Sequence, residues 1–267
     1  MFKGYKLSRI DFKDNLDHYY AVGNKLFKGQ SNTVKSKLDE FFLSDKSLDG
    51  VKIIDSWFPE IKANVFLSHA HRDSKEVVAL SGWLYENFGI IAFIDSCVWG
   101  YGNDLIQILD NQYSRIDEKQ NLYNYKKVLL SASHVHMMLS TALNSMIDKT
   151  ECLIFYDTPN SIKSFESKDK TESPWIYSEI AFSEIARMRH PIRLTSQKPE
   201  IRAFKEGGKL GGIEKGLKVK YDARTKHLKD ITVDHLNEWF NSGTFTSVEE
   251  ALDKFYEITF PLPILIQ

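Results

Sequence analysis

Three short apolar runs, each followed by a stretch with helical spacing, constrain the fold of this chain more than any other feature. They are ANVFLS at 63–68, IIAFID at 90–95 and ECLIFYD at 151–157. A continuous apolar run of this length is typical of a strand buried on both faces. Alternation of such strands with helices predicts βαβ units, and therefore a doubly wound α/β fold with helices on both faces of a parallel sheet. A ligand is expected at the carboxyl ends of the strands.

Helical spacing follows each of these runs. Apolar residues recur at helical intervals in 74–88, and Gly89 ends that pattern. The segment 136–150 is also helical, and in 173–190 Ser173 is placed to cap a helix that has Pro174 at its first position. Beyond these elements, the pattern predicts strands at 191–195 and 217–222 and helices at 234–241 and 247–258.

Composition bounds the class of protein. With 35 basic against 36 acidic residues and a net charge of −1, the chain offers no broad attraction for nucleic acid or an anionic membrane. Cys97 and Cys152 are the only cysteines, so there is no disulfide framework. The first residues lack the apolar segment of a signal peptide, and the longest apolar run, 260–267, is too short to span a bilayer. We therefore expect a cytoplasmic protein.

The first 60 residues differ from the rest in their pattern of polar and apolar residues. They are polar and mixed in pattern, with one helical stretch at 34–44, and Pro59 marks a boundary. We therefore expect an N-terminal extension over 1–60, partly helical, and one domain over 61–260 with an insert near 104–133.

The segment SHAHRD at 68–73 offers one alternative, a metal site. His69, His71 and Asp73 resemble the first metal motif of metallo-β-lactamase-type hydrolases, which also follows a strand. That pattern continues with a further histidine where this chain has Ser74. None of the remaining histidines sits where that pattern has its later ligands; they are His134, His136, His190, His227 and His235. A composite four-histidine site made by His69 and His71 with His134 and His136 stays open. We predict no metal, and the metal-dependent hydrolase is less favoured than the two functions considered below.

Three segments in order carry a different resemblance: VFLSHAHRDS at 65–74, FGIIAFID at 88–95 and SPWIYSEI at 173–180. Their succession resembles the Toll/interleukin-1 receptor (TIR) domain, clearly so over 61–190. The resemblance implies a flavodoxin-like sheet. Two departures concern the loop 96–104, which lacks the usual Pro-Gly, and about 30 extra residues before the helix at 136–150.

Enzymatic TIR domains cleave NAD at the nicotinamide–ribose bond, and their catalytic glutamate matches Glu179. Trp175 lies four residues earlier, so the two side chains share one helix face. Nicotinamide leaves as a neutral base, so one carboxylate that stabilises the oxocarbenium-like ribose is enough, and no general acid is needed. The alternative for Glu179 is a solvent-facing residue, and for Trp175 ordinary core packing.

Further residues are candidates for substrate binding. Asp95 ends the second strand, where it either contacts a ribose or caps the loop. Phe66, His69 and His71 lie at the edge of the first strand, although Phe66 also suits the core. Trp99, in the segment WGYG, belongs either to a lid or to a glycine-rich turn.

The resemblance further implies a biological setting. A nearly free-standing TIR protein resembles those of bacterial antiphage defence, such as the Thoeris systems. There NAD is a substrate rather than a bound cofactor, and an ADP-ribose-derived signal, linear or cyclic, activates a separate effector. TIR enzymes also self-associate. The main alternative is a non-enzymatic TIR interaction module, for which Glu179 is replaceable.

Overall fold

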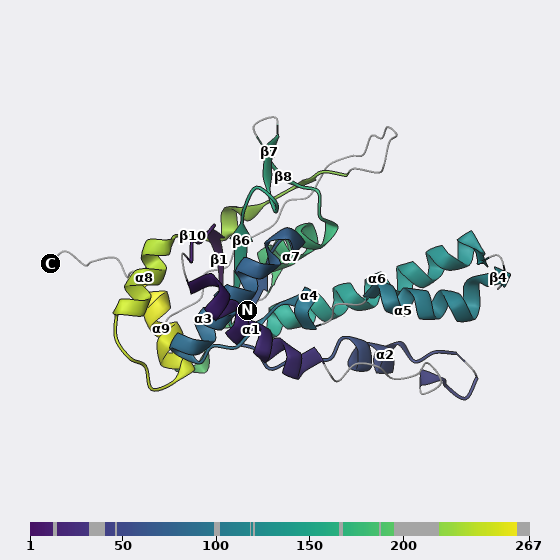
Figure 1. The fold of residues 1–267 in the computed structure, drawn as a ribbon, viewed down its shortest axis with the longest axis horizontal. Coiled ribbons are helices and arrows are strands. Elements are labelled where there is room, and N and C mark those ends of the chain that lie inside the picture. Colours follow the sequence, from purple (N-terminus) through teal and green to yellow (C-terminus); the bar gives the residue numbers. More distant parts are fainter. Residues whose placement is uncertain are drawn as a thin grey trace.

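A five-stranded sheet forms the centre of the molecule, and all its strand pairs are parallel (Figure 1). The structure, a computed structural model, describes residues 1–12, 15–31, 41–45, 47–98, 102–117, 119, 121–165, 168–186, 188–194 and 219–260. In spatial order the strands are β10 (Lys229–Ile231), β1 (Lys3–Ser8), β6 (Cys152–Asp157), β2 (Val65–Ser68) and β3 (Ala92–Phe93).

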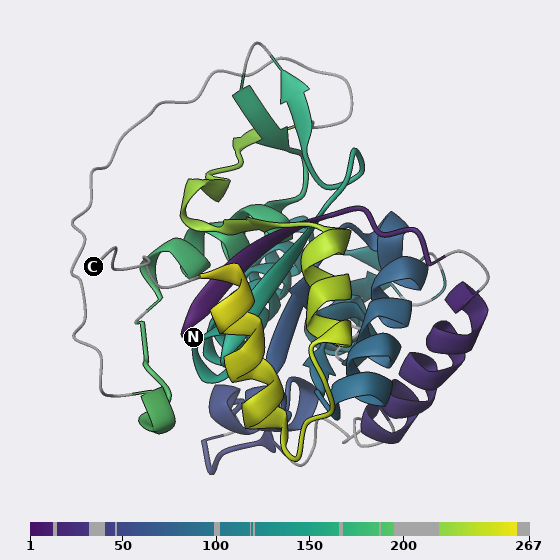
Figure 2. The same ribbon diagram turned by 90° about the vertical axis from the view of Figure 1, so that its left-hand side faces the viewer.

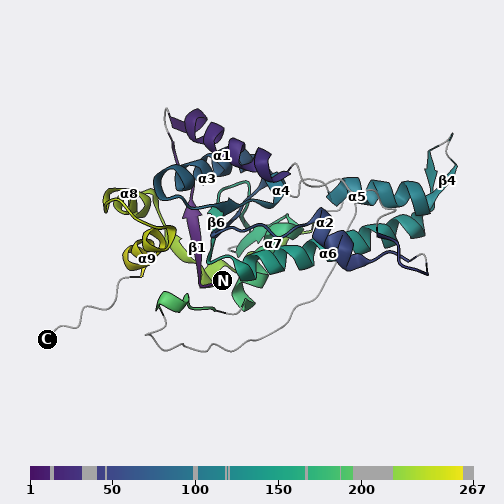
Figure 3. The same ribbon diagram turned by 90° about the horizontal axis from the view of Figure 1, so that it is seen from below.

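Helices flank this sheet on both faces. Figure 3 shows α1 (Leu16–Ser31) and α3 (Ser74–Phe88) on one side, and α6 (Tyr125–Lys149) and α7 (Pro174–Ile185) on the other. The strand order explains this division. The chain moves outward from β2 to the edge strand β3 and then returns across β2 to β6. Since such crossovers are right-handed, the reversal places α3 and α6 on opposite faces. The predicted α/β architecture is confirmed, and the sheet is compatible with a flavodoxin-like fold.

The reversal creates a switch point between β2 and β6. Helices that follow two adjacent strands on opposite faces diverge, and a crevice opens at the carboxyl ends of those strands. Ser68 is the last residue of β2, and its register partner on β6 is Phe155. Any ligand site of the sheet is therefore expected beside Ser68.

The first strand of the sheet was not predicted. Residues 1–60 were expected to be an extension, but β1 lies between β6 and β10 and pairs with both. The side chains of β1 alternate in burial: Tyr5 and Leu7 lie in the core, whereas their neighbours along the strand are partly exposed. The strand is thus an interior element of the sheet, and the expected boundary near residue 60 does not separate it from the domain.

The insert forms an arm that extends away from the sheet (Figure 1). It consists of α5 (Gly102–Leu109), a π-helical segment (Asp110–Ser114), the short antiparallel strands β4 (Arg115–Asp117) and β5 (Leu122–Tyr123), and the first half of α6. The helix predicted at 136–150 therefore begins eleven residues earlier, at Tyr125, where Asn124 caps it. The short helix α2 (Gly50–Trp57) packs against α6.

The two C-terminal helices are confirmed. They are α8 (Val233–Asn241) and α9 (Val248–Thr259), and Figure 2 shows them side by side in front of β1. The ring of Tyr5 lies 4.9 Å from that of Phe255 on α9. Trp239 stacks on Phe88 at the end of α3, with ring centroids 3.9 Å apart. These contacts join the C-terminal helices to the core of the sheet domain.

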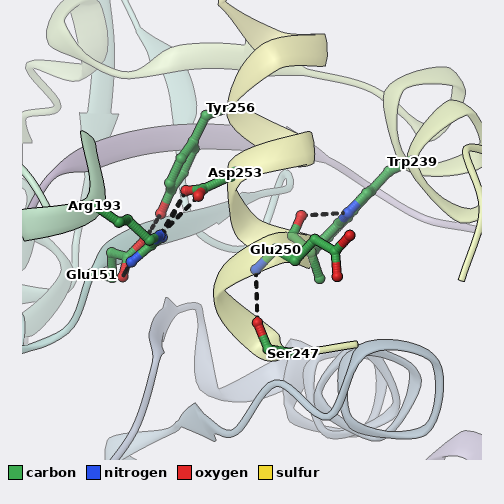
Figure 4. A network of polar contacts seen from close by, with 8 residues as sticks. Glu151, Arg193, Trp239, Ser247, Glu250, Asp253 and Tyr256 are labelled. Carbon is green, nitrogen blue, oxygen red and sulfur yellow. Dashed lines mark hydrogen bonds and ion pairs between the residues drawn. The ribbon is translucent and has the colours of Figure 1, made fainter. Parts of the chain in front are cut away.

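The predicted strand at 191–195 is wrong. Ile192–Leu194 form a single 3-10 turn, in which Arg193 bridges two elements (Figure 4). Its Nε donates to both Asp253 oxygens at 2.9 Å, and one terminal nitrogen donates to Glu151 at 2.5 Å. Tyr256 donates to the same Glu151. Arg193 therefore connects the start of β6 to α9 through its side chain rather than through a strand ladder.

The strand predicted at 217–222 is confirmed only in part. Tyr221–Asp222 form β9, which joins a separate antiparallel sheet with β7 (Lys163–Phe165) and β8 (Lys168–Thr171). The helical stretch predicted at 34–44 lies mostly outside the described residues. Within the described part of the chain, no helix is both long enough and apolar enough to cross a membrane.

A close contact between α1 and α3 depends on two glycines, and this provides a test. A methyl group on Gly82 would lie 2.0 Å from the carbonyl oxygen of Tyr19, and one on Gly23 2.1 Å from that of Val78. Because both obstacles are backbone atoms, we expect Gly82→Ala to lower the free energy of unfolding by about 3 kcal/mol or more. Urea denaturation measures this.

Gly50→Ala is the matched control, since its new methyl group would meet only a flexible methionine terminus at 3.5 Å. We expect it to stay within about 0.5 kcal/mol of wild type. Equal stability of the two variants would contradict the packing of α1 on α3.

Candidate active site

A cavity of about 340 Å³ opens at the switch point. Four parts of the chain line it: the loop after β2, the start of α4 (Asp95–Val98), the base of the arm and the first turns of α7. The lining residues are His69, His71, Asp95, Ser96, Gly102, Asn103, His136, Leu139, Ser173, Trp175, Ile176 and Glu179. The volume lies at the lower end of the range for ligand sites in proteins.

Glu179 is the buried acid of this cavity. Only 4% of it is exposed, and it shares the buried face of α7 with Ile176, Ile180 and Ser183. The hydroxyl of Ser68 donates a hydrogen bond to its Oε2 at 2.5 Å. This bond links the end of β2 directly to α7, across the crevice that opens where the strand order reverses.

The environment of Glu179 disfavours its charge. Burial raises its pKa well above the ordinary value, and the carboxylate of Asp95 raises it further. The hydrogen bond from Ser68 acts in the opposite direction, because it stabilises the carboxylate. A buried acid with a raised pKa in a cleft is a common property of catalytic sites.

The start of α7 fixes the positions of Trp175 and Glu179. Ser173 caps the helix, since its side chain accepts a hydrogen bond from the backbone N–H of Ile176 at 3.3 Å, and Pro174 occupies the first turn. The half-buried Trp175 then lies one turn before Glu179 and contacts His136 of α6 edge-on, with ring centroids 5.7 Å apart. The arm and α7 thus meet at the cavity wall through two aromatic rings.

The histidines after β2 form the opposite wall. His69 is buried, and its Nε2 lies 3.3 Å from the hydroxyl of Ser74. Burial lowers the pKa of His69, while the nearby carboxylates of Asp95 and Asp73 favour its protonated form. His71 is exposed at the rim. The wall therefore offers a neutral hydrogen-bonding ring close to two acids.

The structure brings most of the predicted site residues together. Glu179, Trp175, Asp95, His69 and His71 all line one cavity. Phe66 does not belong to it and is a core residue, fully buried with its ring 5.3 Å from that of Phe93. The predicted Trp99 lies outside the described residues.

Sequence reasoning missed several polar residues of the site. Ser68 holds Glu179, and Ser96, Asn103 and His136 line the cavity. The position of Ser68 at a strand end was a usable signal, because side chains there face the crevice of an α/β sheet. No local signal pointed to Asn103, and the His134–His136 pair suggested only a metal ligand or the start of a helix rather than a cavity wall.

Three histidines of the metal alternative, His69, His71 and His136, line the same cavity, but they do not form a metal-binding cluster. Among the described residues, no three histidine, cysteine or acidic side chains are grouped so that they could hold a metal ion. Asp73 instead accepts hydrogen bonds from Thr158 and Asn160 at 2.5 and 2.6 Å. His227 contacts Ser183, and His235 caps α8.

Comparison of the chain with protein-family models, with curated proteins and with solved structures found no match.

The raised pKa of Glu179 predicts how stability changes with pH. The folded protein holds the Glu179 proton more tightly than the unfolded chain does, so stability falls as pH rises from about 4.3 towards the raised folded value. The variant Glu179→Gln has no ionisable group at this position, so it does not lose stability in this way as pH rises. We expect the variant to be more stable than wild type at neutral pH, with an advantage that shrinks as pH falls towards about 4. Thermal unfolding from pH 4 to 8 measures it, and an advantage independent of pH would contradict the burial of an ionisable Glu179.

Proposed function

We propose that this protein is a TIR-type enzyme that cleaves NAD at the nicotinamide–ribose bond, with Glu179 as the catalytic carboxylate. The observation that carries the proposal is the placement of Glu179. A buried acid faces a cavity at the switch point of an α/β sheet, one helical turn from an aromatic ring. The order of TIR-like segments in the sequence supports the same function.

The reaction needs little from the protein beyond position and charge. The bond between the nicotinamide nitrogen and C1′ of the ribose breaks, and its electron pair leaves with the nitrogen, which becomes neutral. C1′ gains positive, oxocarbenium-like character, which a carboxylate beside it stabilises. A water oxygen then bonds to C1′ and releases one proton. In a cyclic product, another nucleophile of the same molecule replaces the water.

The raised pKa of Glu179 suits a cationic substrate. Without substrate, burial and Asp95 favour the protonated form. A pyridinium ring in the cavity brings a positive charge close to the acid, lowers its pKa and favours the carboxylate. Substrate binding thereby prepares the charge that the transition state requires. Trp175 offers a flat apolar wall for the nicotinamide or the ribose, and Asp95 a partner for the ribose hydroxyls.

The setting that the resemblance implies belongs to this proposal. The substrate is NAD, the products are nicotinamide and an ADP-ribose-derived signal, and a separate effector senses that signal in bacterial antiphage defence. Self-association through the TIR domain is part of the same expectation.

A second function, a non-enzymatic interaction module, is favoured by one feature of the arm. Helix α6 exposes large apolar side chains, among them Tyr125 at 73%, Met137 at 66% and Leu130 at 59%. Exposed apolar groups on one element are typical of a surface that binds another protein. This function predicts that Glu179 is dispensable.

Replacement of Glu179 distinguishes the two functions. We expect Glu179→Gln to reduce nicotinamide release from NAD by about 100-fold or more, since a group that stabilises transition-state charge is lost. Chromatography of NAD and nicotinamide measures the rate. Glu184→Gln is the control, because Glu184 is an exposed acid on the same helix. Wild-type cleavage by Glu179→Gln would exclude the proposed role, and failure of wild type to cleave NAD would favour the interaction module.

The two neighbours of Glu179 predict opposite shifts in pH dependence. If the carboxylate is the active form, kcat/KM rises with pH through the pKa of Glu179. Asp95→Asn removes a charge that raises this pKa, so the midpoint should fall. Ser68→Ala removes a hydrogen bond that lowers it, so the midpoint should rise. Rate profiles from pH 5 to 9 test this, and shifts in the same direction would contradict the assignment.

A further inference from the structure

A second, smaller cavity adjoins the candidate active site. Its volume is about 160 Å³, and it lies between the β7–β8 hairpin, β9 and the start of α7. Ser173 lines both this cavity and the larger one, so the two meet at the cap of α7.

The lining of the small cavity is rich in positive charge. Lys163, Lys170 and Lys220 all line it, and Glu172 is the only acid among its described lining residues. We call this cavity, with its three lysines, the lysine pocket. Ser161, Ser164 and Asn160 add hydroxyl and amide groups to its wall. Ammonium groups together with such hydrogen-bonding groups favour phosphate as a ligand.

Two of the three lysines are direct cross-strand neighbours. Lys163 lies directly opposite Lys170 in the β7–β8 ladder, and like charges in that arrangement repel each other. Asp222 forms an ion pair with Lys170 from the other side. Lys220 lies 3.3 Å from the ring centre of Phe165. Once Asp222 has paired with Lys170, Lys163 and Lys220 face the pocket, where Glu172 is the only acid among the described lining residues. An anion in the pocket would relieve their repulsion.

We infer that the lysine pocket binds the phosphate groups of the substrate whose nicotinamide riboside part occupies the larger cavity. The inference rests on the proposed function and extends it, because it assigns substrate discrimination to residues outside the catalytic cavity. A cavity of about 340 Å³ takes only part of a dinucleotide, so the remainder must lie elsewhere. The lysine pocket begins at Ser173, beside the N-terminal end of α7, where the helix dipole also favours negative charge. The substrate class is therefore a phosphate-bearing nucleotide rather than a free nucleoside.

A comparison of two substrates tests this inference. NAD carries a diphosphate, whereas nicotinamide riboside has the same scissile bond and no phosphate. We expect the double variant Lys163→Ala, Lys220→Ala to raise KM for NAD about tenfold or more and to leave KM for nicotinamide riboside within about twofold. Lys168→Ala is the control, since Lys168 lies exposed on the same hairpin but does not line the pocket. Equal effects on both substrates, or the same effect from the control, would overturn the inference.

A binding experiment separates this inference from the proposed function. Calorimetric titration of the full chain with inorganic pyrophosphate requires no cleavage. We expect wild type and Lys168→Ala to bind pyrophosphate equally and the double lysine variant to bind it about tenfold or more weakly. This result upholds the lysine pocket even if NAD is not cleaved. Absence of binding to wild type, or equal binding to all three proteins, overturns it even if NAD is cleaved.

Discussion

The candidate site depends on one constraint, the reversal at β2 of the order in which successive strands are added across the sheet. Because β3 lies on one side of β2 and β6 on the other, the helices that follow these strands leave on opposite faces. The crevice between them receives Ser68 from the end of β2 and Glu179 from α7, and their hydrogen bond spans it. The arm then supplies a wall that no strand of the sheet provides, since His136 and Leu139 of α6 line the cavity.

Glu179 occupies a position that packing alone would give to an apolar residue. Its neighbours on the buried face of α7 are Ile176 and Ile180, and one hydrogen bond, from Ser68, offsets part of the cost of removing a carboxyl group from water. A fold that keeps an acid there, close to Asp95, sacrifices stability for a group with unusual affinity for a proton. A site of this kind responds strongly to a positive charge placed beside it.

Much of the sheet could be predicted because the signal is local. In β2 and β6 nearly every residue is buried, so the apolar run is itself the strand. Strand β1 has no such run, because Gly4, Lys6 and Ser8 alternate with the buried Tyr5 and Leu7, and its partners lie far away in the sequence. The same division holds for the site. Trp175 and Glu179 are four residues apart on one helix, whereas the contact of Trp175 with His136 depends on how an insert folds.

The interior position of β1 has a consequence for synthesis of the chain. Tyr5 emerges from the ribosome long before its register partners, Ile154 and Lys229. Strand β1 therefore lacks one neighbour until β6 has been made and the other until β10 has been made, and its apolar side chains have no partner strands before then. Folds dominated by such distant pairings form slowly, and their strand edges stay unpaired until the partner strands arrive. We expect nascent chains of this protein to depend on chaperones more than a sheet assembled in sequence order would.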